Sequence, residues 1–198
     1  MARRGNRRPQ DHFGHRARKE GYPARSVYKL QEIDRRLRLF RPGQRVLDLG
    51  AAPGSFSLYA AERVGPTGFV LGIDLQPVQM EGPPQLRFMQ LDLSTATPEL
   101  FAADGPFDVV LSDMAPRTSG QRSRDQYLSY ELYMRALELA AALLHPGGHF
   151  LGKIFQGPEF EDARSATARA LSAVRILKPE ASRSESYEIF LFGTKPQS

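Results

Sequence analysis

Hydrophobic positions along the chain fall into short runs that alternate with stretches of helical spacing. The short apolar runs predict seven strands, at Arg45–Leu49, Phe69–Asp74, Leu86–Gln90, Phe107–Ser112, His149–Phe155, Val174–Leu177 and Glu188–Phe192. Helical spacing predicts further helices over Ser55–Val64, about Arg124–Leu144 and Glu159–Leu171. This alternation predicts an α/β fold, a mostly parallel seven-stranded sheet with helices on both faces.

A first helix precedes all of these strands. It is predicted to start near Ser26 as N-cap and to run to about Phe40, with Leu30, Ile33 and Leu37 on its apolar side. In the long helix that follows the fourth strand, the buried face is predicted to carry Tyr133, Leu137, Ala140 and Leu144. The chain divides into a basic arm, residues 1–20, and one domain, residues 21–198.

Composition narrows the class of protein. The chain has 198 residues, 41% of them hydrophobic, which suits one domain with one core. It has no Cys, which excludes disulfides, Cys-ligated zinc, thiol nucleophiles and iron–sulfur clusters, and its four His residues lack metal-ligand spacing. No apolar run is long enough for a membrane span, and no secretory signal is visible. We therefore expect a soluble cytoplasmic protein without a metal.

Charge is distributed unevenly. Residues 1–45 hold 14 Lys and Arg against 4 Asp and Glu, whereas the rest of the chain holds 13 against 18. The first 19 residues carry seven of these cations with a single acid and almost no apolar side chains, so they are predicted to be disordered when free. A basic arm indicates a polyanionic partner, and nucleic acid is favoured over a tail that only aids solubility. The arm does not distinguish RNA from DNA.

Ligands of parallel α/β sheets bind at the carboxyl ends of the strands. Here the first strand leads into a turn with Gly50 and Gly54, and its small residues allow a ligand to approach the backbone. The Gly-x-x-x-Gly spacing differs from the Gly-x-Gly-x-x-Gly of dinucleotide sites, which disfavours an NAD-dependent oxidoreductase. A nucleoside without phosphates fits better, although such a turn is a weak signal by itself.

Carboxylates follow the next two strands. Asp74 ends the second strand and is placed to accept both ribose hydroxyls of a nucleoside, and Asp92 follows the third and could accept from an adenine amino group. A single Asp at a strand end is more often a turn former. Two in succession after a glycine-rich turn predict an S-adenosylmethionine pocket.

A lysine stands inside the apolar fifth strand. Burying Lys153 is costly unless it is paired, and Asp113, which ends the neighbouring strand, is the expected partner. The alternative is a lysine that extends from the strand end into solvent. The paired, functional interpretation is favoured because of that neighbour.

Five segments in order now match a family. They are Ala24 to Leu30, Asp48 to Phe56, Ser112 to Pro116 with Ser119-Gly120, Gly147 to Gly157, and Lys178 to Glu188. From about Arg16 to its end, the chain resembles the FtsJ/RrmJ-type ribosomal RNA 2′-O-methyltransferases. The resemblance implies a single Rossmann-like, S-adenosylmethionine-dependent domain.

The resemblance also implies site residues. The family's Lys-Asp-Lys-Glu tetrad falls on Lys29, Asp113, Lys153 and Glu188, and the surrounding pattern selects Glu188 over Glu185. The implied cofactor contacts are Gly54, Phe56, Asp74, Asp92 and Asp113, with Phe56 standing where some members have Trp. The implied substrate is a uridine 2′-hydroxyl in large-subunit ribosomal RNA within an assembled particle, and the protein is expected to be a monomer. Transfer RNA and a non-catalytic ribosome-assembly role remain alternatives.

Methyl transfer from a sulfonium to a hydroxyl needs alignment and a base, and no metal. Lys153 is predicted as the principal base. Lys29 is either a second cation that favours the neutral form of Lys153 or a contact to a phosphate or ribose. Asp113 and Glu188 would orient the two lysines, although their charges favour the protonated form. An adenine amino-methyltransferase would carry a stacking aromatic residue after Pro116, where this chain has Arg117. This difference argues for oxygen as the methyl acceptor.

Overall fold

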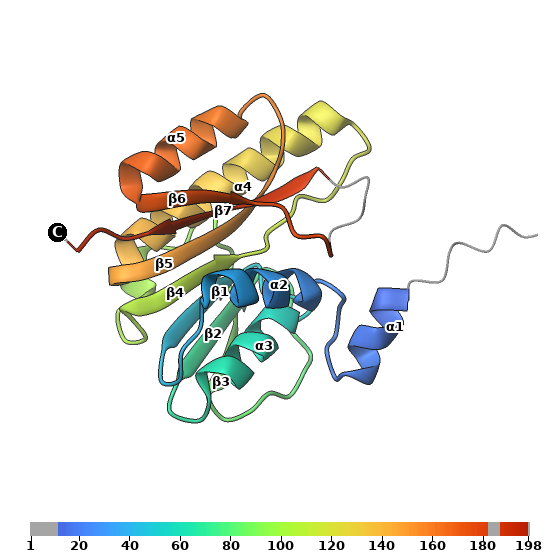
Figure 1. Ribbon diagram of the computed structural model, residues 1–198, viewed down its shortest axis with the longest axis vertical. Coiled ribbons are helices and arrows are strands. Elements are labelled where there is room, and N and C mark those ends of the chain that lie inside the picture. Colours follow the sequence, from blue (N-terminus) through green and yellow to red (C-terminus); the bar gives the residue numbers. More distant parts are fainter. Residues whose placement is uncertain (1–11, 182–186, 198) are drawn as a thin grey trace, which may run out of the picture.

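A seven-stranded sheet runs through the middle of the protein, with helices against both faces (Figure 1). The computed structural model describes residues 12–181 and 187–197. The strand order is β3-β2-β1-β4-β5-β7-β6, and β7 runs antiparallel to the other six strands. The strands are β1 (Arg45–Leu49), β2 (Phe69–Asp74), β3 (Leu86–Gln90), β4 (Phe107–Ser112), β5 (Leu144–Phe155), β6 (Ser172–Leu177) and β7 (Glu188–Thr194).

The helices form two layers. They are α1 (His12–Lys19), α2 (Val27–Leu37), α3 (Ser55–Val64), α4 (Arg122–Leu143) and α5 (Phe160–Ala170), with a 3₁₀ turn η1 (Pro98–Phe101). Helices α2 and α3 cover one face of the sheet, and α4 and α5 cover the other (Figure 1). Each face has its own apolar cluster, so the central strands β1 and β4 are buried on both sides, as in other parallel sheets.

The predicted fold class and all seven strands are confirmed. The largest difference is at β5, which begins at Leu144 and not at His149, because Leu144 already pairs with Phe107 before a shift in register. The predicted helix starting at Ser26 ends at Leu37, since Arg38 adopts a left-handed conformation. The 3₁₀ turn η1 was not predicted.

The segment before α2 also differs from expectation. Residues 12–19 form helix α1, whereas the low apolar content predicted disorder up to residue 19. Ala17 is fully buried, the Phe13 ring packs 5.8 Å from that of Tyr28, and the Arg16 guanidinium lies 5.1 Å from the Tyr28 ring centroid. These contacts with α2 stabilise the helix. The arginines before residue 12 lie outside the described residues.

The strand order creates a crevice at the carboxyl ends of β1 and β4. The chain moves outward from β1 to β3 and then returns to β4 on the other side of β1. At such a reversal the connections leave in opposite directions and open a ligand site between them. Separately, no helix in residues 12–181 and 187–197 is long and apolar enough to cross a membrane.

Candidate active site

Strand register places three of the four predicted tetrad residues together. In the parallel pair β4–β5, Ser112 lies opposite Gly152, so the next residues along, Asp113 and Lys153, are neighbours. In the antiparallel pair β5–β7, Glu188 lies opposite Phe155, two residues beyond Lys153. Side chains two residues apart share a face of the sheet, so Glu188 is the diagonal neighbour of Lys153.

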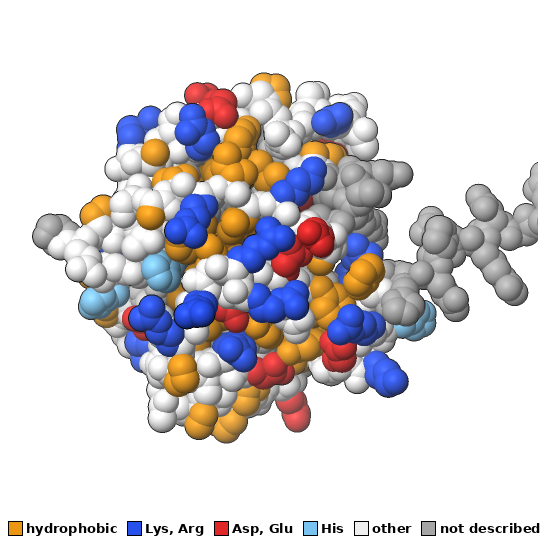
Figure 2. Space-filling view, in the orientation of Figure 1, with side chains coloured by type: hydrophobic (Ala, Val, Ile, Leu, Met, Phe, Trp, Pro, Cys, Tyr) orange, Lys and Arg blue, Asp and Glu red, His pale blue; other side chains and the backbone are white. Residues whose placement is uncertain are grey.

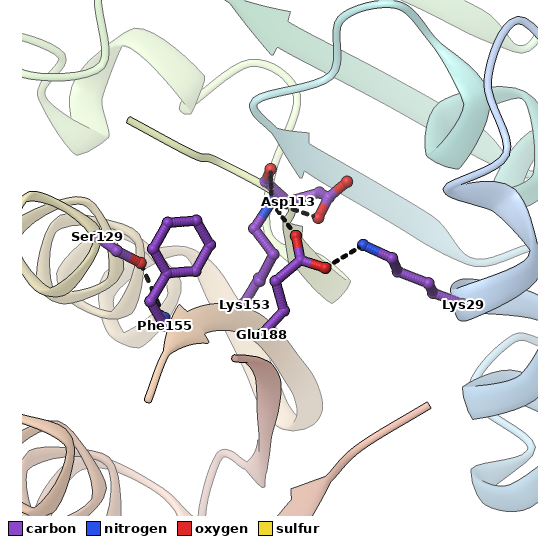
Figure 3. Close-up of polar contacts among 6 residues, drawn as sticks. All are labelled: Lys29, Asp113, Ser129, Lys153, Phe155 and Glu188. Atoms are coloured by element: carbon purple, nitrogen blue, oxygen red, sulfur yellow. Dashed lines mark hydrogen bonds and ion pairs between the residues drawn. The ribbon is translucent and has the colours of Figure 1, made fainter. Parts of the chain in front are cut away.

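The four side chains form a continuous chain of ion pairs (Figure 3). The Lys153 ammonium nitrogen lies 2.8 Å from Asp113 Oδ1 and 3.9 Å from Glu188 Oε1, and it donates a hydrogen bond of 2.7 Å to the main-chain carbonyl of Asp113. Glu188 Oε2 lies 2.5 Å from the ammonium nitrogen of Lys29. Lys153 is only 4% exposed, so its charge is balanced by carboxylates rather than by water. Glu185, the rival considered for the last position, lies outside the described residues.

Lys29 is supplied by α2, on the helical layer that faces this part of the sheet. Its side chain is 11% exposed. The segment just before α2 is attached to the start of α3, where Ser55 Oγ accepts a hydrogen bond from the main-chain nitrogen of Ala24 at 2.8 Å and donates one to its carbonyl at 3.2 Å. Because Ser55 directly follows Gly54, these bonds tie the position of Lys29 to the glycine-rich turn.

A pocket of about 730 Å³ opens beside Asp113. Its size is typical of small-molecule sites. It occupies the crevice between β1 and β4, and its lining includes Gly50, Ala52, Asp74, Asp92, Asp113, Met114 and Arg135. Three of the five predicted cofactor residues, all of them aspartates, therefore lie around one cavity that reaches the tetrad.

Two of these aspartates accept hydrogen bonds from main-chain N–H groups. Asp74 accepts hydrogen bonds from the main-chain nitrogens of Ala52, at 2.9 Å, and Gln76, at 2.8 Å, and so connects the glycine-rich turn to the end of β2. Asp92 accepts from the main-chain nitrogen of Ser94 at 2.9 Å. Hydrogen bonding by the Ser94 side chain and main chain holds the pKa of Asp92 below its ordinary value, so its carboxylate is ready to accept further hydrogen bonds.

The other two predicted cofactor residues do not line the pocket. Gly54 has φ of 111°, and a Cβ there would collide with the sulfur of Met80, which packs against it. Phe56 is 3% exposed and stacks on Phe190, with ring centroids 6.5 Å apart. Since Phe190 lies opposite Lys153 in the sheet, Phe56 packs beneath the tetrad. A cofactor contact for either residue stays a prediction.

Helix α4 supplies a wall of the pocket that the sequence interpretation missed. Leu128, Glu131 and Arg135 line the cavity. Arg135 also donates a hydrogen bond of 2.9 Å to the carbonyl of Leu93 and another to that of Ala96, which secures the segment carrying Asp92. Leu128, Glu131 and Arg135 follow one another at intervals of three and four residues, which places them on one face of a helix. This pattern could have predicted the wall from the sequence.

Asp125, at the start of α4, holds the loop that follows Asp113. Its Oδ1 accepts hydrogen bonds from the main-chain nitrogen and the hydroxyl of Ser119, both at 2.8 Å. The main-chain N–H of Ser119 contributes most to holding the pKa of Asp125 below its ordinary value. This contact accounts structurally for the Ser119-Gly120 element of the sequence pattern.

Asp48 is a buried carboxylate near the site without a positive partner in the described chain. It is fully buried in β1 and accepts a hydrogen bond of 2.5 Å from the Ser57 hydroxyl. Burial, reinforced by repulsion from Asp113 and Asp74, raises the pKa of Asp48 to about 7.

Within residues 12–181 and 187–197, no group of three or more His, Cys, Asp or Glu could hold a metal ion.

The fold and the site together define a class of protein. A pocket of small-molecule size at the reversal point of the sheet, with carboxylates at the strand ends, is typical of an α/β protein that binds a nucleoside-type ligand, and here a lysine–carboxylate cluster lies beside it. Residues 22–195 match the model of the FtsJ-like methyltransferase family. The chain belongs to this family, as the sequence pattern predicted.

Relatives and solved structures agree with this assignment. The chain is 55% identical to a "Ribosomal RNA large subunit methyltransferase E" of Sorangium cellulosum over 93% of this chain and 87% of the relative. It is 52% identical to one of Nitratidesulfovibrio vulgaris, over 91% and 92%. In fold it resembles a structure described as a ribosomal RNA methyltransferase from Plasmodium falciparum, with TM-score 0.75 and 23% identity over 89% and 100% of the two chains.

Another structure with the same fold contains a bound methyl donor. A structure of Aeropyrum pernix fibrillarin with bound S-adenosyl-L-methionine shares the fold, with TM-score 0.59 and 15% identity over 77% of this chain and 67% of that one. The protein is a methyltransferase of the FtsJ-like family.

Proposed function

We propose that this protein transfers a methyl group from S-adenosylmethionine to the ribose 2′-hydroxyl of a uridine in large-subunit ribosomal RNA, within the assembled subunit. The observation that carries the chemistry is the ion-paired series Lys29–Glu188–Lys153–Asp113 at the rim of the 730 Å³ pocket. The substrate rests on the relatives named for that activity, which are 52–55% identical over more than nine-tenths of this chain.

The pocket suits the methyl donor. S-adenosylmethionine supplies a methyl group on a positively charged sulfur. Asp74 would accept hydrogen bonds from the ribose hydroxyls and Asp92 from the adenine amino group, because both carboxylates line the cavity. The turn at Gly54 and the apolar surface of Phe56 are proposed to support the rest of the molecule. Asp113, a member of the tetrad that also lines the pocket, would face the end of S-adenosylmethionine that carries the methyl group.

Lys153 is proposed as the principal base. In its neutral form, its side-chain nitrogen accepts the proton of the 2′-hydroxyl as the oxygen bonds to the methyl group. The bond between that methyl group and the sulfur breaks in the same step, and the donor leaves as an uncharged thioether. The ammonium that results is stabilised where it forms, by the carbonyl and carboxylate of Asp113 at 2.7 and 2.8 Å. Glu188 also pairs with Lys29 at 2.5 Å and so holds this second cation next to Lys153 through a shared carboxylate.

RNA recognition is proposed to begin at the basic N-terminal segment. Helix α1 carries Arg16, Arg18 and Lys19 in its last turn, and Arg25 follows with its guanidinium 5.6 Å from the Phe13 ring centroid. Cations combined with exposed aromatic surface suit a splayed single-stranded segment. The protein is expected to act as a monomer in the cytoplasm, where its ribosomal substrate is assembled.

Transfer of labelled methyl from S-adenosylmethionine tests this function. Large ribosomal subunits lacking the modification, free ribosomal RNA and transfer RNA are assayed in parallel, and the labelled nucleotide is identified after digestion. Label on a 2′-O-methyluridine of the subunits alone supports the proposal. Label on transfer RNA keeps the chemistry and replaces the substrate. Tight cofactor binding with no label on any of the three contradicts the proposal and favours a binding role.

A further inference from the structure

A second hollow, of about 710 Å³, lies at the opposite edge of the sheet from the tetrad. It is lined by the end of α2, the segment leading into β1 and the end of α3, and its charged residues are Asp34, Arg35, Arg38, Arg41 and Arg63. Figure 2 shows Lys and Arg side chains gathered over the ends of these two helices. None of this cluster belongs to the motifs assigned to the active site.

The charges in this hollow are not balanced. Asp34 is the one acid in the lining, is 5% exposed, and already accepts hydrogen bonds from the Tyr59 hydroxyl, at 2.8 Å, and the main-chain nitrogen of Phe40, at 3.2 Å. Arg63 lies 3.5 Å from it. Arg35, Arg38 and Arg41 are exposed, and none has an ion-pair partner among the described residues. Three guanidinium groups without a carboxylate partner among the described residues therefore border the hollow.

Arg38 occupies a backbone position that usually belongs to glycine. It follows the last residue of α2 with φ of 52° and ψ of 52°, and its N–H bonds to the carbonyl of Asp34. Only one other non-glycine residue in the described chain, Ala173, has a positive φ. A side chain in this conformation is strained, and glycine would terminate the helix more easily. The strained residue, Arg38, is one of those that line the hollow.

We infer that this arginine cluster binds the phosphate backbone of the RNA substrate at a nucleotide distant from the one that is methylated. This inference rests on the proposed function. Guanidinium groups match phosphate oxygens with paired hydrogen bonds. The aromatic residues of the lining, Phe40 and Tyr59, are 7% and 8% exposed, so the hollow offers little of the apolar surface that a protein partner would bury.

The position of the cluster determines which part of the RNA it can reach. Lys29 and Arg38 are nine residues apart along α2, which corresponds to about 13 Å of helix. One ribose and its own phosphates cannot span both sites. The cluster therefore acts on a flanking segment, and it orients the RNA so that the target ribose meets the pocket.

Two double variants of equal charge change test the inference. Arg35→Gln/Arg41→Gln removes two cations from the hollow, and Arg164→Gln/Arg169→Gln removes two exposed cations from α5. Binding to unmodified large subunits is measured over a range of salt concentrations, and methyl transfer is measured separately for KM and kcat. The hollow variant is expected to bind at least about tenfold more weakly near 0.1 M salt, with the loss in KM and a log–log salt slope shallower by about 1.5. The α5 variant is expected to keep the wild-type affinity and slope.

Equal affinity and equal salt slope for the two double variants would overturn the inference. That result would leave the hollow as a site for an acidic protein segment, which does not contribute to RNA binding. Binding is measured separately from turnover. A wild-type protein that binds subunits without methylating them would refute the proposed function. The binding data for the two double variants would still decide the inference.

Discussion

The two edges of the sheet use positive charge in opposite ways. At the carboxyl edge, Lys29 and Lys153 are nearly buried and each lies within 2.8 Å of a carboxylate. At the amino edge, Arg35, Arg38 and Arg41 are exposed around a hollow whose one acid is already engaged. Only the first set of cations is held in place by carboxylates of the protein itself.

The difference follows from what each edge has to do. A catalytic base must be held in one position relative to its substrate. Ion pairs in a region of low exposure hold it there. A backbone contact needs cations that are free to replace the counterions of a phosphate, and pairing within the protein would remove that capacity.

The largest effect is expected at the carboxyl edge. Replacing Lys153 with Ala should lower kcat by about 10²–10⁴-fold, because the 2′-hydroxyl loses its base, while the affinity for S-adenosylmethionine changes little. Methyl transfer under single-turnover conditions and cofactor binding by calorimetry measure the two effects. Lys153→Arg is the control, since it keeps a cation between the carboxylates but cannot accept the proton. Wild-type turnover in either variant would contradict the role of Lys153.

Asp48 should make stability depend on pH. Its folded pKa of about 7 lies above its ordinary value near 4, so between these values the folded state binds the proton and the unfolded state does not. The free energy of unfolding should therefore fall as pH rises from about 4 to about 7, by up to about 1.4 kcal/mol per pH unit, and level off above. Urea denaturation at several pH values measures this slope.

The variant Asp48→Asn is the control for that measurement. It keeps an oxygen that can accept from the Ser57 hydroxyl but cannot titrate, so the difference in slope between variant and wild type isolates Asp48. Identical slopes for the two proteins would show that Asp48 does not carry the effect.

Breaking an ion pair should cost more stability where the pair is buried than where it is exposed. Glu188→Gln removes the carboxylate shared by both lysines and should lower the free energy of unfolding by about 1–3 kcal/mol. The control Glu161→Gln breaks an exposed pair with Arg164 on α5 and should cost less than about 1 kcal/mol. Equal costs measured by urea denaturation would remove the distinction between the two kinds of charge.

The smallest effect is expected at Arg38. Arg38→Gly should raise the free energy of unfolding by about 1 kcal/mol, because glycine adopts φ of 52° without strain. The same variant should bind subunits more weakly, since it removes one cation from the hollow. A gain in stability together with a loss of binding would show that the strain serves recognition. A loss of stability would show instead that the Arg38 side chain supports the fold.

Local patterns in the sequence predicted the seven strands of this fold and the helices α2 to α5, but neither α1 nor η1. Alternating apolar runs and helical spacing were sufficient for every strand, and the residues after β2, β3 and β4 were recognised as site candidates because parallel strands end at one edge. The bounds were less accurate where the neighbouring strand decides them. Leu144, for example, is part of β5 only because Phe107 lies opposite it.

The resemblance to a family identified the tetrad, and the tertiary structure decided how its members contact one another. Lys29 and Glu188 are 159 residues apart, and no local pattern links them. Their contact depends on α2 packing against the sheet and on β7 running antiparallel to β5.

The pocket wall on α4 and the arginine hollow also required the tertiary structure. Each is built from segments that meet only after the helices pack on the sheet, as when Arg35 and Arg63 come to line one cavity. Residue type and spacing thus determined which side chains carry chemistry. Long-range packing decided which of them are buried and paired and which stay exposed, because burial and pairing depend on neighbours that are distant in the chain.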